Sequence, residues 1–520
     1  MHGMTAIELC RRYFDELLHR SMILPGEGTD QYSQKIKSCQ LHDMIREICI
    51  SKAREENLVF TLEEGCCLSD TQGAIRHLVI GSNWKRDKDV LENMLDLSHV
   101  RSLTVFGEWR SFFISDNMRF LRVLDLEDTL ELKDHHLDEI GQLHHLKYLS
   151  LRGCRNILYL PNSLRNLRHL EMLDVRGTRI YELPKAVTNL LKLQQLRADS
   201  YFYSAGNVKE EGDRVGKYED YTKHDCRCQI CGICLCRDHV FLRPQVLDAG
   251  LERYDICNKY RFQERQLDGV IVPKGFGKLE ALHALGVVDI SGRNGNATIK
   301  ELGLLTQLHK LKVSGVSYRN VDELWSAIAG HNQLKSLSVK IGDMGEKRNE
   351  LDCCLGEGLL PPNSFESLTL VGKLVNITKW IYKLQNLSKL VLEYSRFVQD
   401  DDAIQALGSL PNLAVLRLQW NSLVWTRLHF QSSSFPSLMV LELFGLEDLL
   451  LVLFEEEAMP KLELLQVNWC KRLNAFYGLP VLTSLKEIRL GTHRLRETLK
   501  ESVQSQVAGH MKHVRVNIVD

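Results

Sequence analysis

The sequence predicts an α/β solenoid, in which short parallel strands from successive repeats stack into one continuous sheet. Three observations support this prediction: a leucine spacing that recurs along most of the chain, an apolar alternation of period two inside each copy, and a proline-led segment between copies. The chain has 520 residues, several times the usual domain length, which leaves room for many repeats.

The recurring unit is a leucine, two further residues and then Leu-x-Leu, as in "LRVLDLEDT", "LEMLDVRGT" and "LAVLRLQWN". We call the first apolar residue of Leu-x-Leu the repeat centre. Neighbouring centres are mostly 21 to 26 residues apart, with one gap of 31, which is the period of a leucine-rich repeat. The clear centres are Leu124, Leu149, Leu173, Leu311, Leu337, Leu390, Leu416, Leu465 and Ile488, and the weaker ones are Leu78, Leu103, Leu196, Leu285, Leu368 and Leu441.

Each Leu-x-Leu is expected to be a strand whose apolar side faces inward, because side chains alternate across a strand. One such strand cannot bury its apolar side alone, so stacked copies form a horseshoe with a concave parallel sheet. Segments such as "LPNSLRNLRHL" and "LPKAVTNLLKL" belong to the convex side, where a short helical turn follows Pro161 and Pro184. Unrelated amphipathic helices would show a period of 3.6, which the strand segments lack.

One interval breaks the repeat period, because Leu196 and Leu285 lie 89 residues apart. The repeat pattern resumes near Ile271, in "IVPKGFGKLEALHAL". We therefore divide the chain into repeats over 71–198, an insertion over 199–270 and further repeats over 271–520. Much of the insertion is polar and lacks periodicity, which is typical of a long loop.

A cysteine cluster lies inside the insertion, in "HDCRCQICGICLCRDH". Overlapping C-x2-C units can place thiolates on one side of a tight turn, as a tetrahedral zinc ion requires. The alternative is a reduced Cys-rich loop without metal, because a second C-x2-C pair at zinc-finger distance is absent. The candidate zinc ligands are Cys226, Cys228, Cys231, Cys234 and Cys236.

Composition narrows the class of protein and its surroundings. The net charge of −1 gives no overall bias toward nucleic acid, so we expect no nucleic-acid partner. The N-terminus lacks the apolar core of a secretory signal, and no apolar run is long enough to span a bilayer. Fifteen cysteines without a secretion signal indicate free thiols in a reducing compartment, so we expect a cytoplasmic protein.

Residues 1–70 do not follow the repeat. "GMTAIELCRRYFDELLHRSMILP" predicts an amphipathic helix ending near Arg20 and then a short extended segment. "KIKSCQLHDMIREICISKAREENLVF" predicts a strand followed by a second helix. His42 and Asp43 stand where this second helix begins, and Asp43 is expected to cap it by accepting backbone N–H groups.

These segments, together with the repeats, resemble the plant intracellular nucleotide-binding leucine-rich-repeat immune receptors of the NB-ARC type. In that family the winged-helix subdomain of the nucleotide-binding switch carries a Met-His-Asp motif, which reads Leu41-His42-Asp43 here, with Leu in place of Met. The resemblance implies that residues 1–70 are the end of a winged-helix domain. It also implies that His42 contacts the diphosphate of ADP, since an imidazole can donate a hydrogen bond to phosphate.

The chain contains no G-x-x-x-x-G-K-[ST] phosphate loop, which is the part that cradles the phosphates in this family. We therefore expect the chain to be the C-terminal portion of a longer receptor or a truncated gene product. For the chain alone we expect no cofactor and no enzymatic activity, and ADP or ATP only in a full-length receptor. The implied intramolecular partner is the receptor's own nucleotide-binding module, packed against the N-terminal repeats, where Arg152 and Arg176 form a basic pair.

A protein-binding surface is predicted on the concave sheet. Tyr394, Trp420 and Trp469 each stand four residues after a repeat centre, and aromatic side chains aligned across strands are good interface anchors. The alternative is that these are scattered surface aromatics. The predicted partner-binding set also includes Phe444, one position earlier in the intervening repeat, and the strand residues Arg417 and Arg489, which can pair with acidic groups.

The expected function is that of the sensor and autoinhibitory region of a plant innate immune receptor. The implied partner is a pathogen effector or a host protein that the effector alters. One alternative is a leucine-rich-repeat substrate adaptor of a ubiquitin ligase, although residues 1–60 carry the His-Asp motif instead of an F-box-like opening. An enzyme or metal sensor built on the Cys cluster is a further alternative, but no nucleophile–base pair accompanies the cluster.

Overall fold

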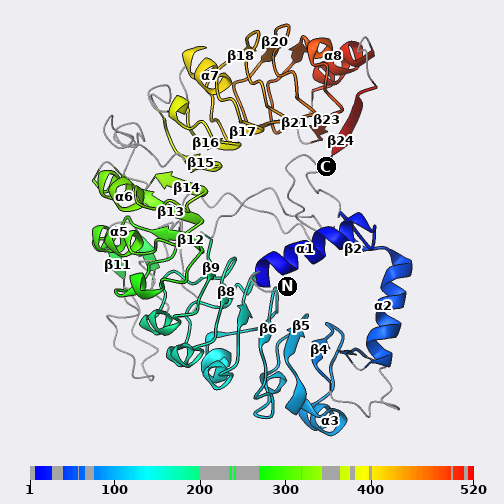
Figure 1. Cartoon of the computed structure of the whole chain (residues 1–520), viewed down its shortest axis with the longest axis vertical. Helices are drawn as coiled ribbons and strands as arrows, with labels where there is room; N and C mark the ends of the chain where they lie inside the picture. The colour runs from blue at the N-terminus through cyan, green and yellow to red at the C-terminus, as the bar shows by residue number, and fades with distance from the viewer. Residues whose placement is uncertain are drawn as a thin grey trace. The chain divides into compact units, whose positions relative to one another are not determined.

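The computed structural model shows a parallel sheet built from the predicted repeats (Figure 1). The residues that it describes are 6–25, 39–56, 58–64, 75–199, 234–236, 239–241, 269–317, 319–341, 364–374, 381–396, 401–492, 496–508 and 513–519. Among these residues, no helix is long and apolar enough to cross a membrane.

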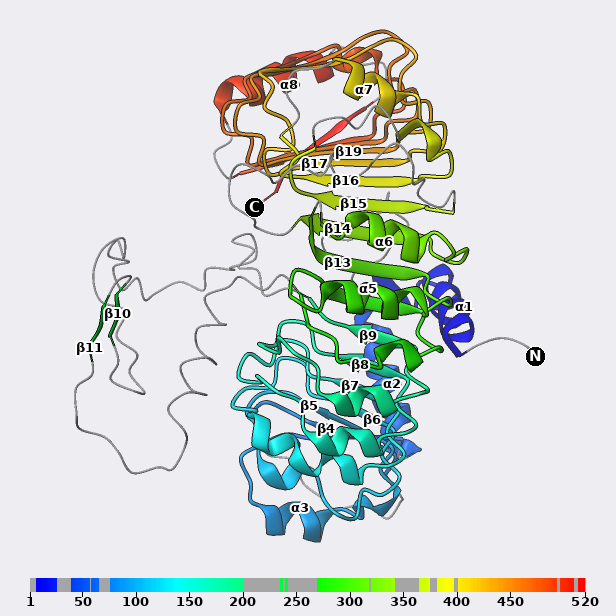
Figure 2. The same cartoon turned by 90° about the vertical axis from the view of Figure 1, so that its left-hand side faces the viewer.

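Seventeen described strands follow one another in the sheet, and neighbouring strands that are hydrogen-bonded to each other are parallel. In Figure 2, strands β13 to β17 and β19 run side by side, as their pairing requires. The strands are β3 Val59–Leu62, β4 His77–Ile80, β5 Ser102–Val105, β6 Val123–Asp125, β7 Tyr148–Ser150, β8 Met172–Asp174, β9 Gln195–Arg197, β12 Ala284–Asp289, β13 Lys310–Val316, β14 Ser336–Ile341, β15 Ser367–Val371, β16 Lys389–Glu393, β17 Val415–Gln419, β19 Val440–Phe444, β21 Leu464–Asn468, β23 Glu487–Gly491 and β24 Arg515–Val519.

The register of the sheet confirms the repeat assignment. All fifteen predicted centres pair with the centres of the neighbouring strands, from Leu78 with Leu103 at one end to Leu465 with Ile488 at the other. The row continues beyond both ends, because Phe60 pairs with Leu78 and Ile488 with Val516. The sheet therefore has one strand more at each end than the sequence motif indicates.

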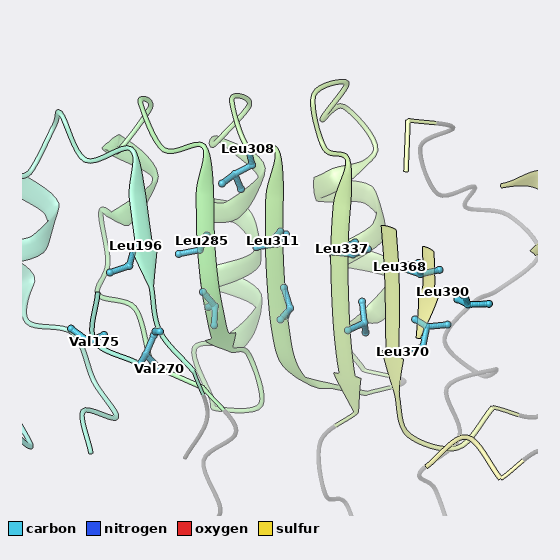
Figure 3. Packing of buried hydrophobic residues seen from close by; sticks show 14 of the residues in the cluster. Val175, Leu196, Val270, Leu285, Leu308, Leu311, Leu337, Leu368, Leu370 and Leu390 are labelled. Carbon is cyan, nitrogen blue, oxygen red and sulfur yellow. The ribbon is translucent and has the colours of Figure 1, made fainter. Parts of the chain in front are cut away.

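The core lies behind the sheet and runs through all repeats as one cluster. Figure 3 shows the inward row of centres, with Leu285, Leu311 and Leu337 from neighbouring strands in line. These side chains are 0 to 2% exposed. Each repeat buries its leucines only against the adjacent repeats, so the period in the sequence is also the unit of packing.

Helices and short 3-10 turns return the chain behind the sheet. The helical turns predicted after Pro161 and Pro184 are present as 3-10 turns at Asn162–Asn166 and Lys185–Asn189. The last repeats instead carry a second parallel sheet, in which Phe430, Phe454 and Phe476 stack. The α-helices are α3 Lys88–Met94, α5 Gly295–Gly303, α6 Val321–Ile328, α7 Asp401–Gly408 and α8 Glu497–Ala508, and the second sheet is β18 Arg427–Phe430, β20 Leu451–Phe454 and β22 Ala475–Tyr477.

The elements predicted near the N-terminus are also present. Helix α1 spans Ala6–His19, strand β1 Ile23–Pro25 pairs antiparallel with β2 Cys39–Leu41, and α2 spans Asp43–Glu55. The next strand, β3, already belongs to the repeat sheet, so the predicted boundary at residue 70 lies later in the chain than the start of the sheet. That these elements end a winged-helix domain stays a prediction.

The insertion forms a compact unit of its own, Phe202–Leu267. Its described residues form an antiparallel pair, β10 Cys234–Cys236 with β11 His239–Phe241. The repeat sheet continues without it, because β9 pairs directly with β12.

Candidate functional site

The three aromatic residues of the predicted lane share an unusual backbone conformation. Tyr394, Trp420 and Trp469 have φ angles of 53°, 46° and 58°, in the left-handed region that favours glycine. Other repeats have glycine at the same position, four residues after the centre, as at Gly153 and Gly445 with φ of 75° and 64°. In these repeats the turn that leaves the strand has a left-handed residue at this position, and three repeats place an aromatic side chain there.

Hydrogen bonds between neighbouring repeats explain this requirement. The N–H of Trp420 donates to the carbonyl of Phe444 at 2.8 Å, and the N–H of Gly445 donates to the carbonyl of Asn468 at 2.9 Å. Such bonds continue the ladder past the end of the strand while the chain turns away. A non-glycine residue held in this conformation costs roughly 1–3 kcal/mol. Twelve non-glycine residues of the described chain have a positive φ, including Asp128 at this same turn position, so the three positions are set apart by their aromatic side chains and not by the strain alone.

The rings of Tyr394, Trp420 and Phe444 form a contiguous set, which we call the aromatic cluster. The rings of Tyr394 and Trp420 are stacked, with centroids 6.4 Å apart and planes 6° apart. Phe444 meets Trp420 edge to face, at 4.8 Å and 75°. The Tyr394 side chain is 47% exposed, whereas Trp420 and Phe444 are half-buried. The cluster therefore presents aromatic surface to solvent while its rings hold one another in place.

Gly445 provides the space into which Trp420 packs. A Cβ atom at position 445 would lie 2.9 Å from Cε3 of the indole, which is too close for any residue but glycine. Trp469 occupies the same turn position on β21, and β19 lies between it and the strand of Trp420. The structure thus brings Tyr394, Trp420 and Phe444 into ring contact, and Trp469 lies two strands from Trp420, next to the strand of Phe444.

The two predicted arginines lie on the sheet, but both are engaged within it. Arg417 Nε lies 2.9 Å from Glu442 Oε2 on the neighbouring strand, and Gln419 donates to the other carboxylate oxygen at 2.6 Å. Arg489 Nε donates to Glu487 Oε1 at 2.7 Å. The expectation that these guanidinium groups serve acidic groups of a partner is therefore weakened, because intramolecular carboxylates already bind them.

The basic pair in the N-terminal repeats is also compensated. Arg152 pairs with Glu127 at 2.7 Å, and Arg176 binds the buried carboxylate of Asp174 through Nε and a terminal nitrogen. Hydrogen bonding to Asp174 raises the pKa of Arg176. These arginines stabilise the strand surface on which they lie.

The carboxylate of Glu393 lies next to the aromatic cluster in the chain, and Lys340, Glu442 and Lys312 are close enough to affect its charge. Burial raises the pKa of Glu393, which precedes Tyr394 in the chain. Burial, together with the nearby Glu393 carboxylate, also raises the pKa of the Tyr394 phenol. The phenol therefore remains protonated and can donate a hydrogen bond to a bound partner.

His42 caps helix α2 and reaches solvent. Its carbonyl accepts from Arg46 N–H at 2.9 Å, and its Nδ1 accepts from Met44 N–H at 3.3 Å. The prediction that Asp43 is the cap is therefore wrong, because Asp43 is the first residue inside the helix. There its carboxylate interacts favourably with the positive end of the helix dipole. With Nδ1 accepting, a neutral His42 carries its proton on Nε2.

Comparison with known protein families matches residues 99–208 and 264–517 to the family described as "Leucine-rich repeat region". The chain belongs to the leucine-rich-repeat family. This confirms the predicted α/β solenoid. Among solved structures, a leucine-rich-repeat protein of Leptospira interrogans matches 90% of this chain and 98% of that chain, at 14% identity and a TM-score of 0.41.

Curated relatives of this leucine-rich-repeat protein are plant disease resistance proteins. Pik-2 of Oryza sativa subsp. japonica is 25% identical over 509 residues, covering 94% of this chain and 46% of the relative. RPP8 of Arabidopsis thaliana is 28% identical over 502 residues, with the same shares covered. The chain thus spans about half the length of the curated relatives it matches, as expected from its resemblance to the C-terminal portion of such receptors.

The Cys cluster of this leucine-rich-repeat protein falls mostly outside the described residues. Cys226, Cys228 and Cys231 lie outside them, and of Cys234 and Cys236 only the backbone is described, in strand β10. Within the part of the chain that the structure describes, no group of three or more His, Cys, Asp or Glu side chains could hold a metal. Zinc binding by the cluster stays a prediction.

The role of Gly445 and the strain at the aromatic positions were not predicted from the sequence. A signal for both was present, because glycine recurs four residues after the centres Leu149, Leu173 and Leu441. Where an aromatic residue replaces glycine at this position, the turn keeps its left-handed backbone conformation and gains a side chain.

Proposed function

We propose that this chain is the sensor and autoinhibitory region of an intracellular plant immune receptor, and that the aromatic cluster recognises a pathogen effector or an altered host protein. Similarity to disease resistance proteins over 94% of the chain supports the receptor assignment. The same comparisons do not favour the ubiquitin-ligase adaptor. In this proposal the chain works in the cytoplasm, is not an enzyme, and acts by binding proteins.

The observation that carries the recognition surface is the strained, stacked set of aromatic rings. Tyr394 and Trp420 adopt a conformation that costs free energy, although glycine occupies the same position in other repeats. Tyr394 is 47% exposed, so the core gains little from its ring. Aromatic side chains of this kind dominate the energetics of protein interfaces.

A binding experiment tests this surface. The chain is screened against a panel of secreted pathogen proteins, and the Kd of each binder is measured for the wild type and for Trp420→Ala. We expect Trp420→Ala to weaken binding by about 2 kcal/mol or more. The matched control is Tyr477→Ala, which removes a ring that is 52% exposed on β22 of the second sheet. Binders that lose equal affinity in both variants, or in neither, would contradict the proposed surface.

We propose further that His42 contacts ADP in a full-length receptor. The cap bond leaves the Nε2 proton of the neutral ring free to donate to a phosphate oxygen, which is the chemistry that the family resemblance implies. In a receptor containing the nucleotide-binding module, His42→Ala should speed ADP release about tenfold or more, since a hydrogen bond to a charged group contributes roughly 1.5–3 kcal/mol.

The variant His42→Asn separates the two roles of this residue. Asparagine is a good helix cap, so it restores the cap of α2 without restoring the imidazole. Fast ADP release in both variants supports a phosphate contact. Fast release in His42→Ala but normal release in His42→Asn would show that only the cap matters.

A further inference from the structure

A row of basic and aromatic side chains lies along one edge of the sheet, where the chain enters each strand. In each repeat the residues two, four and five positions before the centre occupy this edge. For the repeats centred at Leu103 to Leu196, these positions hold the cations Arg101, Arg119, Arg122, Lys147, Arg168 and Lys192. All six are exposed. We call this set the basic edge.

Backbone hydrogen bonds fix the spacing of the basic edge. The N–H of Arg122 donates to the carbonyl of Arg101, and the N–H of Lys147 donates to the carbonyl of Arg122, both at 2.8 Å. These residues are therefore held in successive strands of one ladder, about 4.8 Å apart. Arg101, Arg122 and Lys147 thus form a regular row, and the next residue of this ladder is Glu171, whose N–H donates to the carbonyl of Lys147 at 2.8 Å.

Stacked rings run beside the cations. Phe120 and His145 are 6.0 Å apart with planes 24° apart, and His145 and His169 are 6.2 Å apart with planes 25° apart. Lys192 continues the row, because its Nζ lies 3.2 Å from Nδ1 of His169. Phe120 is 58% exposed, so the row presents an aromatic face as well as positive charge.

The positive charge of this edge is largely uncompensated. Within the described part of the chain, the one ion pair made by these six cations joins Lys147 to Glu171 at 2.6 Å. By contrast, Arg152 pairs with Glu127 of the preceding repeat, and Arg176 pairs with Asp174 of its own repeat. The whole chain has a net charge of −1, so the row is a local excess of charge and not a reflection of composition.

Later repeats show that the fold does not require this chemistry. In the repeat centred at Leu416, the same three positions hold Pro411, Asn412 and Ala414. Their backbone continues the same ladder, since Ala414 N–H donates to the carbonyl of Ser388 at 2.8 Å. Uncharged residues therefore allow the same backbone hydrogen bonds at these positions. The fold alone does not explain why the N-terminal repeats carry cations there.

We propose that the basic edge binds an acidic segment of a partner protein, lying across the repeats centred at Leu103 to Leu196. Carboxylates spaced along such a segment would pair with the arginines and lysines of the basic edge. The stacked rings would contact the aliphatic parts of the segment's side chains. This surface lies four or more repeats away in sequence from the aromatic cluster, and it does not depend on the function proposed for that cluster.

Charge-reversal variants of the full chain test the proposal. Poly-L-glutamate is the probe, and poly-L-lysine is the control polymer of opposite charge. Wild type should bind poly-L-glutamate but not poly-L-lysine, and added salt should weaken binding because exposed charges are screened. Arg122→Glu and Arg168→Glu should each lower the affinity at least about fivefold, through loss of an ion pair and the like charge introduced.

The control is Lys461→Glu, which makes the same charge change at an edge position of the distant repeat centred at Leu465, four residues before the centre as Lys192 is in its own repeat. Lys461 is exposed, and we expect its variant to bind within about twofold of wild type, because the charge lies outside the row. Equal loss in all three variants would overturn the proposal, since it would show a dependence on net charge alone. Binding to phosphatidylserine vesicles without binding to poly-L-glutamate would also overturn it, in favour of a membrane surface. Unchanged melting temperatures show that the variants fold.

Discussion

At the scale of single residues, the aromatic cluster combines two opposing contributions to stability. The ring contacts of Trp420 stabilise the fold, whereas its left-handed backbone destabilises it. Alanine at this position would lose the ring and keep the strain. Glycine would lose the ring and relieve the strain, because it has no Cβ to clash with the carbonyl.

We therefore expect Trp420→Gly to be more stable than Trp420→Ala by about 1 kcal/mol. Urea unfolding of both variants measures the difference. Leu418→Ala, which truncates a fully buried side chain on the same strand, should cost about 2–5 kcal/mol and shows that the assay resolves core damage. Equal midpoints for the two Trp420 variants would mean that the turn imposes no strain.

His331 is a second residue that is expected to lower the stability of the fold, because its polar ring is buried. It is 1% exposed, and among the described residues no hydrogen-bond partner lies within reach of either ring nitrogen. Six residues before other centres the chain has leucine, as at Leu143, Leu305 and Leu410. A polar ring thus occupies a position that the repeat normally fills with an apolar side chain.

Replacing His331 by leucine should raise the free energy of unfolding by about 1–3 kcal/mol, because an unpaired buried polar group is removed. Chemical denaturation monitored by circular dichroism would measure the gain. The reverse change at the equivalent position of the preceding repeat, Leu305→His, should destabilise the chain. If His331→Leu has no effect or lowers stability, the imidazole has a partner that stabilises it.

At the scale of elements, cross-strand pairs join the C-terminal repeats. Arg417 and Glu442 stand opposite each other on β17 and β19, and their side chains are only 16% and 13% exposed. The ion pair is therefore screened less than a surface pair, and its two members depend on each other for charge compensation.

Glu442→Gln should lower stability by about 1–3 kcal/mol, since it leaves a largely buried guanidinium with weaker compensation. The double variant Arg417→Met with Glu442→Leu should recover most of this loss, because both charges are then absent. A double-mutant cycle from denaturant midpoints measures the coupling. Additive effects would show that the pair contributes nothing to the packing of β17 on β19.

At the scale of the whole molecule, the strands on either side of the insertion pair directly with each other in the repeat sheet. Val287 N–H donates to the carbonyl of Ala198 at 3.0 Å, and Val270 N–H donates to the carbonyl of Val287 at 2.9 Å. The two ends of the insertion therefore meet on the same residue of β12. A short connection can join them without moving a strand.

Deletion of residues 202–267, with a short Gly-Ser linker in their place, should leave the melting temperature of the chain within a few degrees of wild type. Calorimetry measures this, and zinc analysis of both proteins locates any bound metal. Zinc in the full chain but not in the deletion variant would assign it to the Cys cluster. A collapse of thermal stability on deletion would show that the insertion supports the repeats.

The sequence by itself determined the repeat architecture, because the leucine period is also the unit of packing. The fifteen centres pair as the spacing predicts, and the sheet continues from β9 to β12 across the interval in which the period is missing. The added strands at Phe60 and Val516 lay outside the prediction, since they lack the full motif and are recognised only by the neighbour with which they pair.

Only the tertiary structure decided the chemistry of the surfaces. Sequence position placed Trp420 and Arg417 on the sheet, but not the stacking of Trp420 above Gly445 or the pairing of Arg417 with Glu442. It also suggested Asp43 as a cap where the imidazole of His42 accepts the hydrogen bond. The physical reason is that a repeat period is encoded locally in every copy, whereas backbone strain, ring contacts and ion pairs depend on side chains that meet only when distant copies stack.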